Sequence, residues 1–583
     1  MSSSASSDTP SGACETRKLT GAFFRGRQPT ELRFGTSGLR GLVVDITDLE
    51  VYVNTRGFVD YIIHMNESCV TRPVSVAADL RPSSDGSDRS IVRAVLAALN
   101  DAGLDSEYLG RIPTPALTLH GLSRERLSIM VTGSHIPFDR NGIKFNKASG
   151  EVLKSDEAGI LSAVQQVRER LYAQPASESP FSDDGMFRLS PPAADPRGHA
   201  TAVQEYGRRY RDFFGEDALG GLRVAFYQHS AVGRDLVVDL LRMLGAEVVP
   251  MGRSESFVAI DTEALSADTL AALQTMADAV RGSHGPVDAV VSTDGDSDRP
   301  LVAGVTPEGR VQFIPGDQLG MLVAAQLGVD GVAVPVSAND GLDAWVAKAG
   351  VRLKKTRIGS PHVIAAMADL VGSGCRRVVG WEANGGFLTG SVLERAGRTL
   401  ASLPTRDAVL PIVTALAAVR TLGRPLCVLQ DELPKRYGRA GLLDQFPVEI
   451  SRRMVRGLSP GAGDIEEADL EGSAIRVRKA EGDWLAAEPS LGSNLTEIGR
   501  RLAGFFAEGD GLGSVVRLNY LDGVRATFAS GEVIHVRPSG NAPQLRCYTV
   551  ADTPERATRL LELALQEPHG VLRRMEAAFS TGN

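Results

Sequence analysis

The chain has 583 residues, more than one hydrophobic core can organise, so we expect about three to five domains. Hydrophobic residues make up 43% and charged residues 23% of the sequence, as in ordinary globular proteins, and the formal net charge of −8 argues against nucleic acid as the main partner. The five cysteines lie far apart without a C-x-x-C pair, which is typical of a reducing compartment and not of a disulfide framework or a zinc site.

The N-terminus, MSSSASSDTPSGACETRKLTG, is rich in Ser and Thr and lacks the apolar segment of a signal peptide. We interpret residues 1–20 as a disordered leader. The longest nearly apolar stretch, from Ala408 to Val419, is far too short to span a membrane. We therefore expect a cytoplasmic protein without a membrane partner.

Short apolar strands alternate with amphipathic helices through the first two-thirds of the chain, which is typical of α/β domains. The order strand, polar loop, helix recurs three times. The pairs are RPVSVAADL with DRSIVRAVLAALNDAG, LRVAFYQHS with GRDLVVDLLRMLGAE, and GVAVPVSAND with GLDAWVAKAG. We interpret them as three related α/β modules.

Changes in composition predict the domain boundaries. The segment AQPASESPFSDDGMFRLSPPAADPRG, rich in Pro, Ser and Asp, links the first two modules, and a second boundary falls near Val311. After about Pro434 the pattern changes to strands rich in β-branched residues, followed by a final helix from Pro554. The predicted domains are α/β at 21–195, 196–310 and 311–433, and α+β at 434–583.

The segment DAVVSTDGDSDRPLV carries the strongest local signal. An apolar strand delivers Asp294, Asp296 and Asp298 within five residues. Because two like charges about 4 Å apart repel by about 4 kcal/mol at an effective dielectric of about 20, three converging carboxylates favour a bound cation. Oxygen ligands alone select a hard ion such as Mg²⁺. A solvated acidic turn is the alternative interpretation.

Two other acidic motifs fail on spacing. An EF-hand loop that begins at Asp294 needs Gly at its sixth position and Glu at its twelfth, where the chain has Arg299 and Val305. A haloacid-dehalogenase phosphatase motif needs Thr or Val at its fifth position. The chain has Asp298 there, or Pro300 if the motif starts two residues later.

The segment IMVTGSHIPFDRNGIKF places Ser134 beside His135, with Lys144 in the strand that follows. Immediate neighbours are badly placed to act as a serine and its base. A loop restricted by Pro137 and by glycines can nonetheless present Ser134 to a ligand. The alternatives are a turn with incidental polar residues and a surface lysine in an ion pair.

Two later segments are weaker taken alone. GWEANGG offers Glu382 and Asn384, residue types that hydrogen-bond sugar hydroxyls. RPSGNAPQLRCY offers a guanidinium, a hydroxyl and backbone N–H donors that suit a phosphate dianion. Its candidate residues are Arg537, Ser539, Gly540 and Asn541.

Together these segments resemble the α-D-phosphohexomutase superfamily, the phosphoglucomutase/phosphomannomutase enzymes. The motifs are FGTSGLRG (34–41), TGSHIPFDRNGIKF (132–145), DGDSDR (294–299), GWEANGG (380–386) and RPSGNAP (537–543). They extend over almost the whole chain beyond the leader. The resemblance implies three α/β domains with mixed sheets and a smaller C-terminal α+β domain around a central cleft.

The resemblance also implies a mechanism for interconverting hexose 1-phosphate and hexose 6-phosphate. Ser134 would be phosphorylated and would bind Mg²⁺ together with Asp294, Asp296 and Asp298. It would pass its phosphoryl group to the substrate, form a hexose 1,6-bisphosphate, and regain the other phosphate after that intermediate turns over. Charge neutralisation on the transferring group would be the main catalytic task. The substrate is a small-molecule sugar phosphate.

Further roles follow from the resemblance. Lys144, Arg40 and His135 would manage the hydroxyl proton, and Arg299 matches the arginine that closes the metal loop. Glu382 and Asn384 would bind sugar hydroxyls. The distal phosphate would bind at Arg537, Ser539, Gly540 and Asn541.

The chain departs from the family pattern in three loops. Asn384 and Gly386 stand where Ser and His are common, Asn541-Ala542 where Thr-Glu is common, and Gly133 and Ile136 where Ala and Asn are common. These changes leave the chemistry intact but affect the choice of sugar, and we favour mannose or glucose phosphate over an amino sugar. The alternatives are a catalytically silent sugar-bisphosphate-binding regulator and a sugar phosphatase on the same fold.

Overall fold

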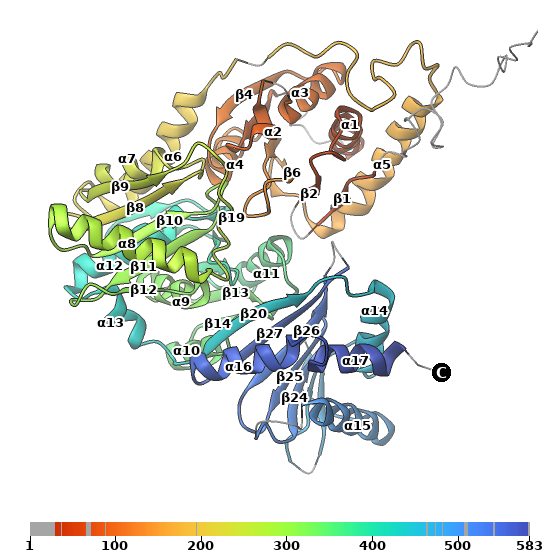
Figure 1. Ribbon diagram of the computed structural model, residues 1–583, viewed down its shortest axis with the longest axis vertical. Helices are drawn as coiled ribbons and strands as arrows, with labels where there is room; N and C mark the ends of the chain where they lie inside the picture. The colour runs from red at the N-terminus through yellow and green to blue at the C-terminus, as the bar shows by residue number, and fades with distance from the viewer. Residues whose placement is uncertain are drawn as a thin grey trace, which may run out of the picture. The chain divides into compact units, whose positions relative to one another are not determined.

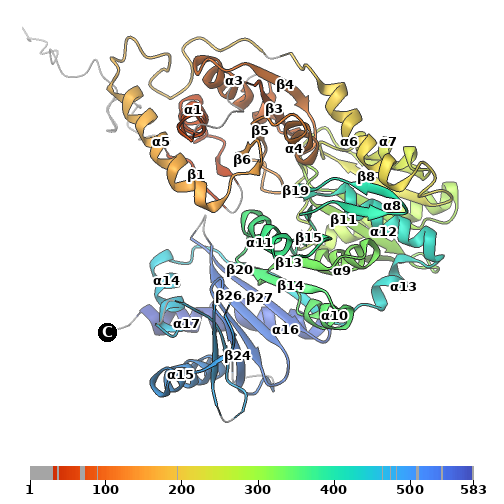
Figure 2. The same ribbon diagram turned by 180° about the vertical axis from the view of Figure 1, so that it is seen from behind.

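The computed structural model (Figures 1 and 2) describes residues 30–35, 38–65, 72–87, 89–193, 195–461, 464–472, 474–480, 482–506, 511–539 and 543–580. The predicted leader, residues 1–20, lies outside this part of the chain. Two compact units emerge. Unit 1 contains the chain up to Arg208 with Ser230–Gly233 and Ser254–Ala259, and unit 2 contains the remainder.

One mixed β-sheet of seven strands forms the centre of unit 1. Its strands are β1 (Arg33–Phe34), β2 (Leu39–Leu42), β3 (Val74–Ala78), β4 (Ser106–Arg111), β5 (Ser128–Val131), β6 (Arg140–Lys147) and β7 (Gly150–Glu151). They lie in the order β1-β2-β6-β5-β3-β4, with β7 paired to β6. β3 is parallel to β4 and β5, and the other neighbours are antiparallel.

The helices of unit 1 begin where polar side chains cap them. Thr47 accepts a hydrogen bond from the Glu50 N–H at the start of α1, and Ser90 accepts one from the Arg93 N–H at the start of α3. α1 packs against both α3 and α5. The helices are α1 (Asp48–His64), α2 (Pro82–Asp85), α3 (Ile91–Asp101), α4 (Thr114–Leu122) and α5 (Lys154–Ala173), and α6 (His199–Phe214) contains the unit boundary.

A second mixed sheet, within unit 2, has the order β12-β11-β10-β8-β9. Its strands are β8 (Arg223–His229), β9 (Glu247–Arg253), β10 (Ala289–Thr293), β11 (Pro300–Val305) and β12 (Val311–Phe313). β8 is parallel to β9 and β10, whereas β11 and β12 are antiparallel. The helices α7 (Leu236–Met243) and α8 (Ala267–His284) connect its parallel strands.

The third sheet, also in unit 2, has the order β14-β13-β15-β16-β19. Its strands are β13 (Gly331–Pro335), β14 (Arg352–Thr356), β15 (Val378–Trp381), β16 (Phe387–Thr389) and β19 (Leu403–Asp407), and β17 (Leu393–Arg395) pairs with β18 (Arg398–Leu400). The helices are α9 (Gly316–Leu327), α10 (Gly341–Ala349), α11 (Ser360–Gly372), α12 (Val409–Leu422) and α13 (Leu426–Asp431). Gly320 allows α9 to approach the buried Trp381, since a Cβ at this position would lie 2.5 Å from the indole ring.

The three sheets share one topology. In each, a central strand is parallel to two neighbours, and the chain leaves the later neighbour through a loop into an antiparallel strand. This confirms the prediction of three related α/β modules with mixed sheets. The loops that follow β5, β10 and β15 are equivalent, and they contain the predicted serine, metal and sugar motifs respectively.

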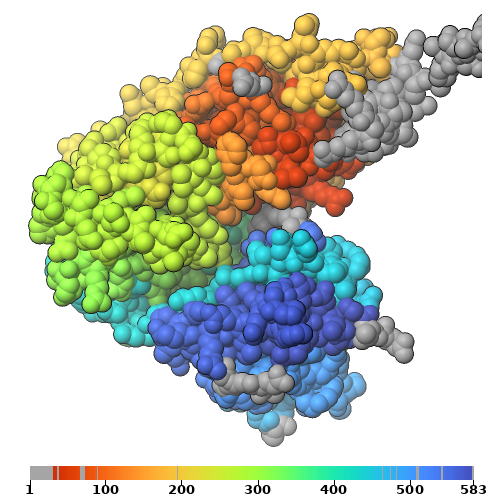
Figure 3. Space-filling model, viewed as in Figure 1, coloured from red at the N-terminus to blue at the C-terminus, as the bar shows by residue number. Residues whose placement is uncertain are grey.

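The C-terminal part of unit 2 is an antiparallel sheet of eight strands with helices on one face, as predicted for an α+β fold. The strands are β20 (Tyr437–Leu443), β21 (Ile465–Asp469), β22 (Arg476–Lys479), β23 (Leu485–Ala486), β24 (Val515–Asn519), β25 (Val524–Phe528), β26 (Val533–Pro538) and β27 (Leu545–Ala551). The helices are α14 (Val448–Gly457), α15 (Pro489–Phe505), α16 (Pro554–Leu565) and α17 (Val571–Ser580). These residues form the continuous blue lobe of Figure 3.

The predicted final helix is in fact two helices. α16 ends at Leu565 and α17 begins at Val571, with Pro568 between them. Proline lacks the backbone N–H that a helix needs and obstructs the preceding turn, so the helix cannot continue through it. In the part of the chain that the structure describes, no helix has the length and apolar character needed to cross a bilayer.

Candidate functional site

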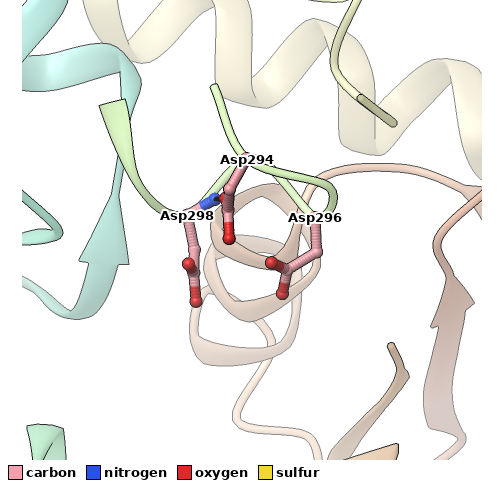
Figure 4. Close-up of side chains that lie close together, drawn as sticks. All are labelled: Asp294, Asp296 and Asp298. Atoms are coloured by element: carbon pink, nitrogen blue, oxygen red, sulfur yellow. Dashed lines mark hydrogen bonds between the residues drawn. The ribbon is translucent and has the colours of Figure 1, made fainter. Parts of the chain in front are cut away.

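The predicted metal loop connects β10 to β11 and brings three carboxylates together (Figure 4). Asp294, Asp296 and Asp298 point to the same side of the loop, and one oxygen from each lies within 4.8 Å of the others. All three residues are fully buried. The interpretation of this segment as a solvated acidic turn is therefore wrong.

Backbone contacts fix the shape of the metal loop. Oδ1 of Asp294 accepts hydrogen bonds from the N–H groups of Asp298 and Arg299, both at 3.1 Å. Ser297 adopts a left-handed conformation with φ 58°, and its hydroxyl lies 2.8 Å from that of Thr293. The loop is thus a closed turn whose first aspartate organises its own backbone, which leaves little freedom for the carboxylates to separate.

Basic side chains offset only part of this negative charge. Arg406 of β19 lies 2.9 Å from Asp298 Oδ2, and Arg299 Nε lies 3.6 Å from Asp298 Oδ1. At 4.8 Å, the upper limit of these separations, two carboxylates repel by roughly 3–4 kcal/mol at an effective dielectric of about 20. The oxygen-only donor set and its spacing fit a hard divalent cation, and Mg²⁺ matches the ligand type.

The predicted sugar loop is the equivalent connection from β15 to β16. Glu382 and Asn384 are 5% and 6% exposed, so both are held within the fold and retain only a small accessible surface. Asn384 Oδ1 accepts a hydrogen bond from the Gly386 N–H at 3.0 Å, and its backbone carbonyl accepts one from the Thr262 hydroxyl at 2.7 Å. The amide orientation of Asn384 is therefore set by the loop itself.

Arg406 connects the metal loop with the sugar loop. Its Nη1 donates to Glu382 Oε2 at 2.8 Å, while its Nε donates to Asp298 Oδ2 at 3.0 Å. Arg406 is itself only 2% exposed. The guanidinium therefore fixes the distance between the two predicted site residues. Sequence reasoning missed Arg406, whose only signal is an arginine near the end of the short strand LPTRD.

In unit 1, the predicted serine loop connects β5 to β6 and is organised by Arg81. The Arg81 guanidinium donates hydrogen bonds to the backbone carbonyls of Ser134, Ile136, Pro137 and Arg140. It also lies 3.8 Å from the ring centroid of Phe257, in a cation–π contact. Sequence reasoning missed this residue as well, although it follows directly after a buried strand.

Asp79 completes the support of the serine loop. It accepts hydrogen bonds from the Thr132 hydroxyl and the Gly133 N–H, and its Oδ2 lies 3.3 Å from Arg81 Nε. Burial raises the pKa of Asp79, whereas Arg81 and the Ser84 hydroxyl act in the opposite direction. Asp79 thus binds the first residues of the serine loop, and Arg81 binds the backbone carbonyls that follow.

Ser134 sits in this loop in a conformation that non-glycine residues rarely adopt. Its φ is 52°, it is 1% exposed, and its N–H donates to the Thr132 hydroxyl at 2.8 Å. His135 Nδ1 lies 3.4 Å from the Ser134 hydroxyl. Left-handed backbone of this kind costs free energy and is found where surrounding contacts impose it, often at functional sites.

The other two predicted proton-managing residues lie on strands that border the serine loop. Arg40 of β2 pairs in register with Gly142 of β6, and Lys144 follows two residues later in β6. Lys144 is 7% exposed, so its interpretation as a surface lysine is wrong. Ser134, His135, Lys144 and Arg40 thus all belong to the β2, β5 and β6 region of the first sheet.

The predicted phosphate loop follows β26 in the fourth sheet. Arg537 lies near the end of that strand, and its Nη1 is 3.5 Å from Asp522 Oδ2. Burial works against the charged form, but Tyr548 and Asp522 outweigh it and raise the pKa of Arg537. The Ser539 N–H donates to the Gln544 carbonyl at 2.9 Å. Gly540 and Asn541 lie outside the described residues.

Glu263 is a further acidic residue near these loops that sequence reasoning missed. Burial and the neighbouring Asp261 raise its pKa to about 7, although Arg546 and Arg299 lower it. The charge of Glu263 interacts with Arg299 of the metal loop, with Glu382 of the sugar loop and with Arg537 of the phosphate loop. Its segment before α8 carries no motif that would identify it from sequence.

Family comparisons match the chain from its first sheet to its last. Models of the phosphoglucomutase/phosphomannomutase family match as alpha/beta/alpha domain I at residues 31–171, domain II at 205–306, domain III at 315–437 and the C-terminal domain at 475–566.

Individual relatives agree with this result. A phosphomannomutase of Sinorhizobium fredii (strain NBRC 101917 / NGR234) is 36% identical over 536 residues, which cover 91% of this chain and 98% of that protein. A phosphomannomutase of Salmonella muenchen is 36% identical over 534 residues, covering 92% and 95%. The crystal structure of a phosphoglucomutase/phosphomannomutase family protein from Burkholderia thailandensis superposes with a TM-score of 0.58 at 18% identity, covering 94% of this chain and 98% of that one.

Proposed function

We propose a substrate for this chain, which belongs to the phosphoglucomutase/phosphomannomutase family of the α-D-phosphohexomutase superfamily and is thus a phosphohexomutase. It interconverts mannose 1-phosphate and mannose 6-phosphate, with glucose phosphates as its second substrate. The observation that carries the proposal is the convergence of three buried carboxylates after β10, tied by Arg406 to the sugar loop. The preference for mannose rests on the named relatives.

Ser134 is the proposed carrier of the phosphoryl group. In the first transfer, the bond between phosphorus and Ser134 Oγ breaks while a bond forms to the free hydroxyl oxygen of the hexose phosphate. The product is a hexose 1,6-bisphosphate. In the second transfer, its other phosphate returns to Ser134 Oγ and releases the isomerised monophosphate. The Arg81 contacts support this role because they hold the serine in one conformation.

The hydroxyl proton moves to a basic group of unit 1 in the first transfer and returns in the second. Lys144 is the proposed base, and His135 and Arg40 assist it. Lys144 is 7% exposed, so its amine is held within the fold beside the serine loop. A Brønsted base near neutrality is the most effective for such a transfer.

Asp294, Asp296 and Asp298, with the phosphorylated Ser134, are the proposed ligands of Mg²⁺. When bound, this ion would neutralise charge on the transferring phosphoryl group. Arg299 and Arg406 supply fixed positive charge beside the same carboxylates. Arg537 and Ser539 would bind the distal phosphate, and Glu382 and Asn384 the sugar hydroxyls. Gly540 and Asn541 remain predictions from the sequence alone. We propose that the enzyme acts in the cytoplasm on small-molecule sugar phosphates.

A coupled assay tests this function directly. The full chain would be supplied with mannose 1-phosphate or glucose 1-phosphate, Mg²⁺ and a trace of the hexose 1,6-bisphosphate, and formation of the 6-phosphate would be followed. We expect turnover of both, faster with mannose, and little release of inorganic phosphate. Rapid phosphate release would indicate a phosphatase, and no turnover with tight bisphosphate binding would indicate a silent regulator.

Intact-mass analysis supplies the second arm of the test. We expect wild-type protein incubated with hexose 1,6-bisphosphate to gain the mass of one phosphoryl group, and Ser134→Ala protein to gain none. Phosphorylation that persists in the Ser134→Ala protein would contradict the assignment of the carrier. The absence of a phosphoryl mass gain in both proteins would contradict a covalent mechanism.

A further inference from the structure

A large pocket lined by many charged residues lies within unit 2 between the edge strand β14 and the fourth sheet, which are neighbours in Figures 1 and 2. Its volume is about 990 Å³. The walls contain six basic and five acidic side chains, together with Trp484. Its lining residues are distinct from those of the metal, sugar and phosphate loops, so the pocket is separate from the proposed catalytic residues.

The fourth sheet presents a charged face to this pocket because its strands alternate. On β25, Val524 and Ala526 belong to the hydrophobic core under the helices, whereas Arg525 points to the opposite face. Arg525 pairs in register with Asn519 on one side and His535 on the other. It is therefore held in the interior of the sheet, far from either edge.

Arg525 is a buried cation, and one nitrogen of its guanidinium has no hydrogen-bond partner in the described part of the chain. Only 8% of the residue is exposed, and its Nη2 is buried with no hydrogen-bond partner among the described residues. The carboxylates that dominate the field at Arg525 are each paired with a different cation. These pairs are Asp340 with Arg436 at 2.9 Å, Asp343 with Lys355 at 2.6 Å, and Glu467 with Arg478 at 2.8 Å.

Because these three carboxylates are paired with other cations, none of them forms an ion pair with Arg525. Burial lowers the pKa of Arg525, and it also lowers the pKa of Lys355 in the opposite wall. A guanidinium remains charged in proteins, so it cannot relieve this cost by losing its proton. Burying a charge without a counter-charge is unfavourable, and an anion that enters the pocket would offset the cost.

We propose that this pocket binds a small phosphorylated metabolite at a second site, with its phosphate group on the Arg525 guanidinium. The planar fork of arginine matches the geometry of a phosphate, and two N–H groups can donate to two of its oxygens. The exposed Arg517 adds positive charge along the same pocket, whereas Lys354 is paired with Asp369 at 2.7 Å. A volume of about 990 Å³ is enough for a ligand of metabolite size.

Hydrogen bonds beside this pocket connect the segment after β14 with the turn between β24 and β25. Arg357 Nε donates to the Leu521 carbonyl, and the Ile358 N–H donates to Asp522 Oδ2, both at 3.1 Å. The same Asp522 oxygen lies 3.5 Å from Arg537 Nη1 on the catalytic side. A ligand on Arg525 would contact residues other than Arg537 and Ser539, which are proposed for the distal phosphate, so substitutions can test the two places separately.

Equilibrium dialysis of the full chain with inorganic pyrophosphate tests the proposal. An Arg537→Met background weakens anion binding at the phosphate loop, so that the remaining saturable binding reports on the pocket. In that background we expect Arg525→Met to weaken pyrophosphate binding by about tenfold or more, and Arg517→Met by about twofold or less. Arg517 is the matched control because it lines the same pocket but is exposed.

Thermal unfolding without any anion distinguishes binding from a structural role. Since Arg525→Met removes an unpaired buried charge, we expect the variant to unfold at the same temperature as its parent or above it. Pyrophosphate should then raise the unfolding temperature of the parent but not of the variant. The proposal is overturned if the Arg537→Met protein has no saturable pyrophosphate site, or if Arg525→Met binds pyrophosphate as tightly as its parent.

Discussion

Arg406 Nε lies 3.0 Å from Asp298 Oδ2, although 108 residues separate the two in sequence. The same guanidinium is 2.8 Å from Glu382 Oε2, so one side chain of the third sheet holds an aspartate from the second sheet and a glutamate from its own. Both carboxylates and the arginine are at most 5% exposed. The position of the sugar loop relative to the metal loop therefore depends on this single cation.

Replacing this cation should impair both stability and activity. Arg406→Met leaves two buried carboxylates without their partner, which costs about 3–5 kcal/mol of unfolding free energy. Because a bound cation restores part of the missing charge, we expect the loss in unfolding temperature to be larger in chelator than in Mg²⁺. Arg420→Met is the control, since its ion pair with Asp217 is exposed and should contribute less than about 1 kcal/mol. If Arg406→Met lowered the unfolding temperature equally with and without Mg²⁺, a bound cation would not compensate for the missing guanidinium.

Neutralising one of the three carboxylates should separate metal binding from folding. Asp296→Asn removes repulsion within the triad, so we expect its stability in chelator to equal or exceed that of the wild type. A cation at 100 times its dissociation constant stabilises a protein by about 2.7 kcal/mol, and this gain should disappear in the variant along with turnover. Calorimetry with and without Mg²⁺ measures both effects. Asp278→Asn, at an exposed position on α8, should keep the Mg²⁺ response, and its loss there would argue against the triad.

The serine loop should depend on Arg81 far more than on exposed arginines of the same unit. Arg81→Met removes hydrogen bonds to four backbone carbonyls and leaves Asp79 buried without its cation. We expect a loss of about 3–5 kcal/mol in unfolding free energy and much slower phosphorylation by hexose 1,6-bisphosphate. Denaturant unfolding and intact-mass time courses measure these quantities. Arg72→Met, at an exposed position, should change neither the unfolding free energy nor the phosphorylation rate. A normal phosphorylation rate in Arg81→Met would show that the serine loop does not need the hydrogen bonds from Arg81.

Gly133 explains one departure from the family pattern, in which alanine is common at this position. A Cβ at residue 133 would lie 2.5 Å from Arg81 Cζ and Nε, too close for the guanidinium to stay where it is. We expect Gly133→Ala to destabilise the protein by about 1–3 kcal/mol, the usual range for overpacking. Gly282→Ala is the matched control because no atom lies within 4 Å of its Cβ position, and alanine in a helix should add about 0.5–1 kcal/mol of stability. A Gly133→Ala protein of wild-type stability would mean that Arg81 has room to move.

His229 should contribute to the acid sensitivity of the second sheet. It is fully buried, its Nε2 lies 2.8 Å from the Thr293 carbonyl, and burial lowers its pKa to about 4. The unfolded chain binds a proton near pH 6.5 and the folded one only near pH 4. The contribution of His229 to the free energy of unfolding is therefore complete above about pH 6.5. It is lost as the pH drops towards 4, by up to about 3 kcal/mol.

The pH dependence of thermal unfolding tests this contribution. His229→Gln keeps a donor for the Thr293 carbonyl but cannot be protonated, so the fall in stability between pH 6.5 and pH 4 should become shallower. His284→Gln, at the exposed end of α8, should leave the profile unchanged. Parallel profiles for all three proteins would exclude His229 as a source of the acid response.

Sequence predicted those features that depend on neighbouring residues. The alternation of strands and helices indicated the three α/β modules, and the spacing of Asp294, Asp296 and Asp298 after an apolar strand indicated converging carboxylates. Arg81 and Arg406 were missed because their partners are distant in the chain. Arg81 is 53 residues from Ser134, and Arg406 is 108 residues from Asp298. An isolated arginine after a strand carries no sign of which carbonyls or carboxylates it will meet.

The equivalence of the loops after β5, β10 and β15 has a consequence for how such a protein can change. The same position in the three sheets holds three different sets of side chains: the serine proposed to carry the phosphoryl group, three carboxylates, and the two side chains proposed to bind sugar hydroxyls. Because each set consists of a few residues between two strands, replacements at 382–386 can change the preference for a sugar. The sheets and the other two loops need not change.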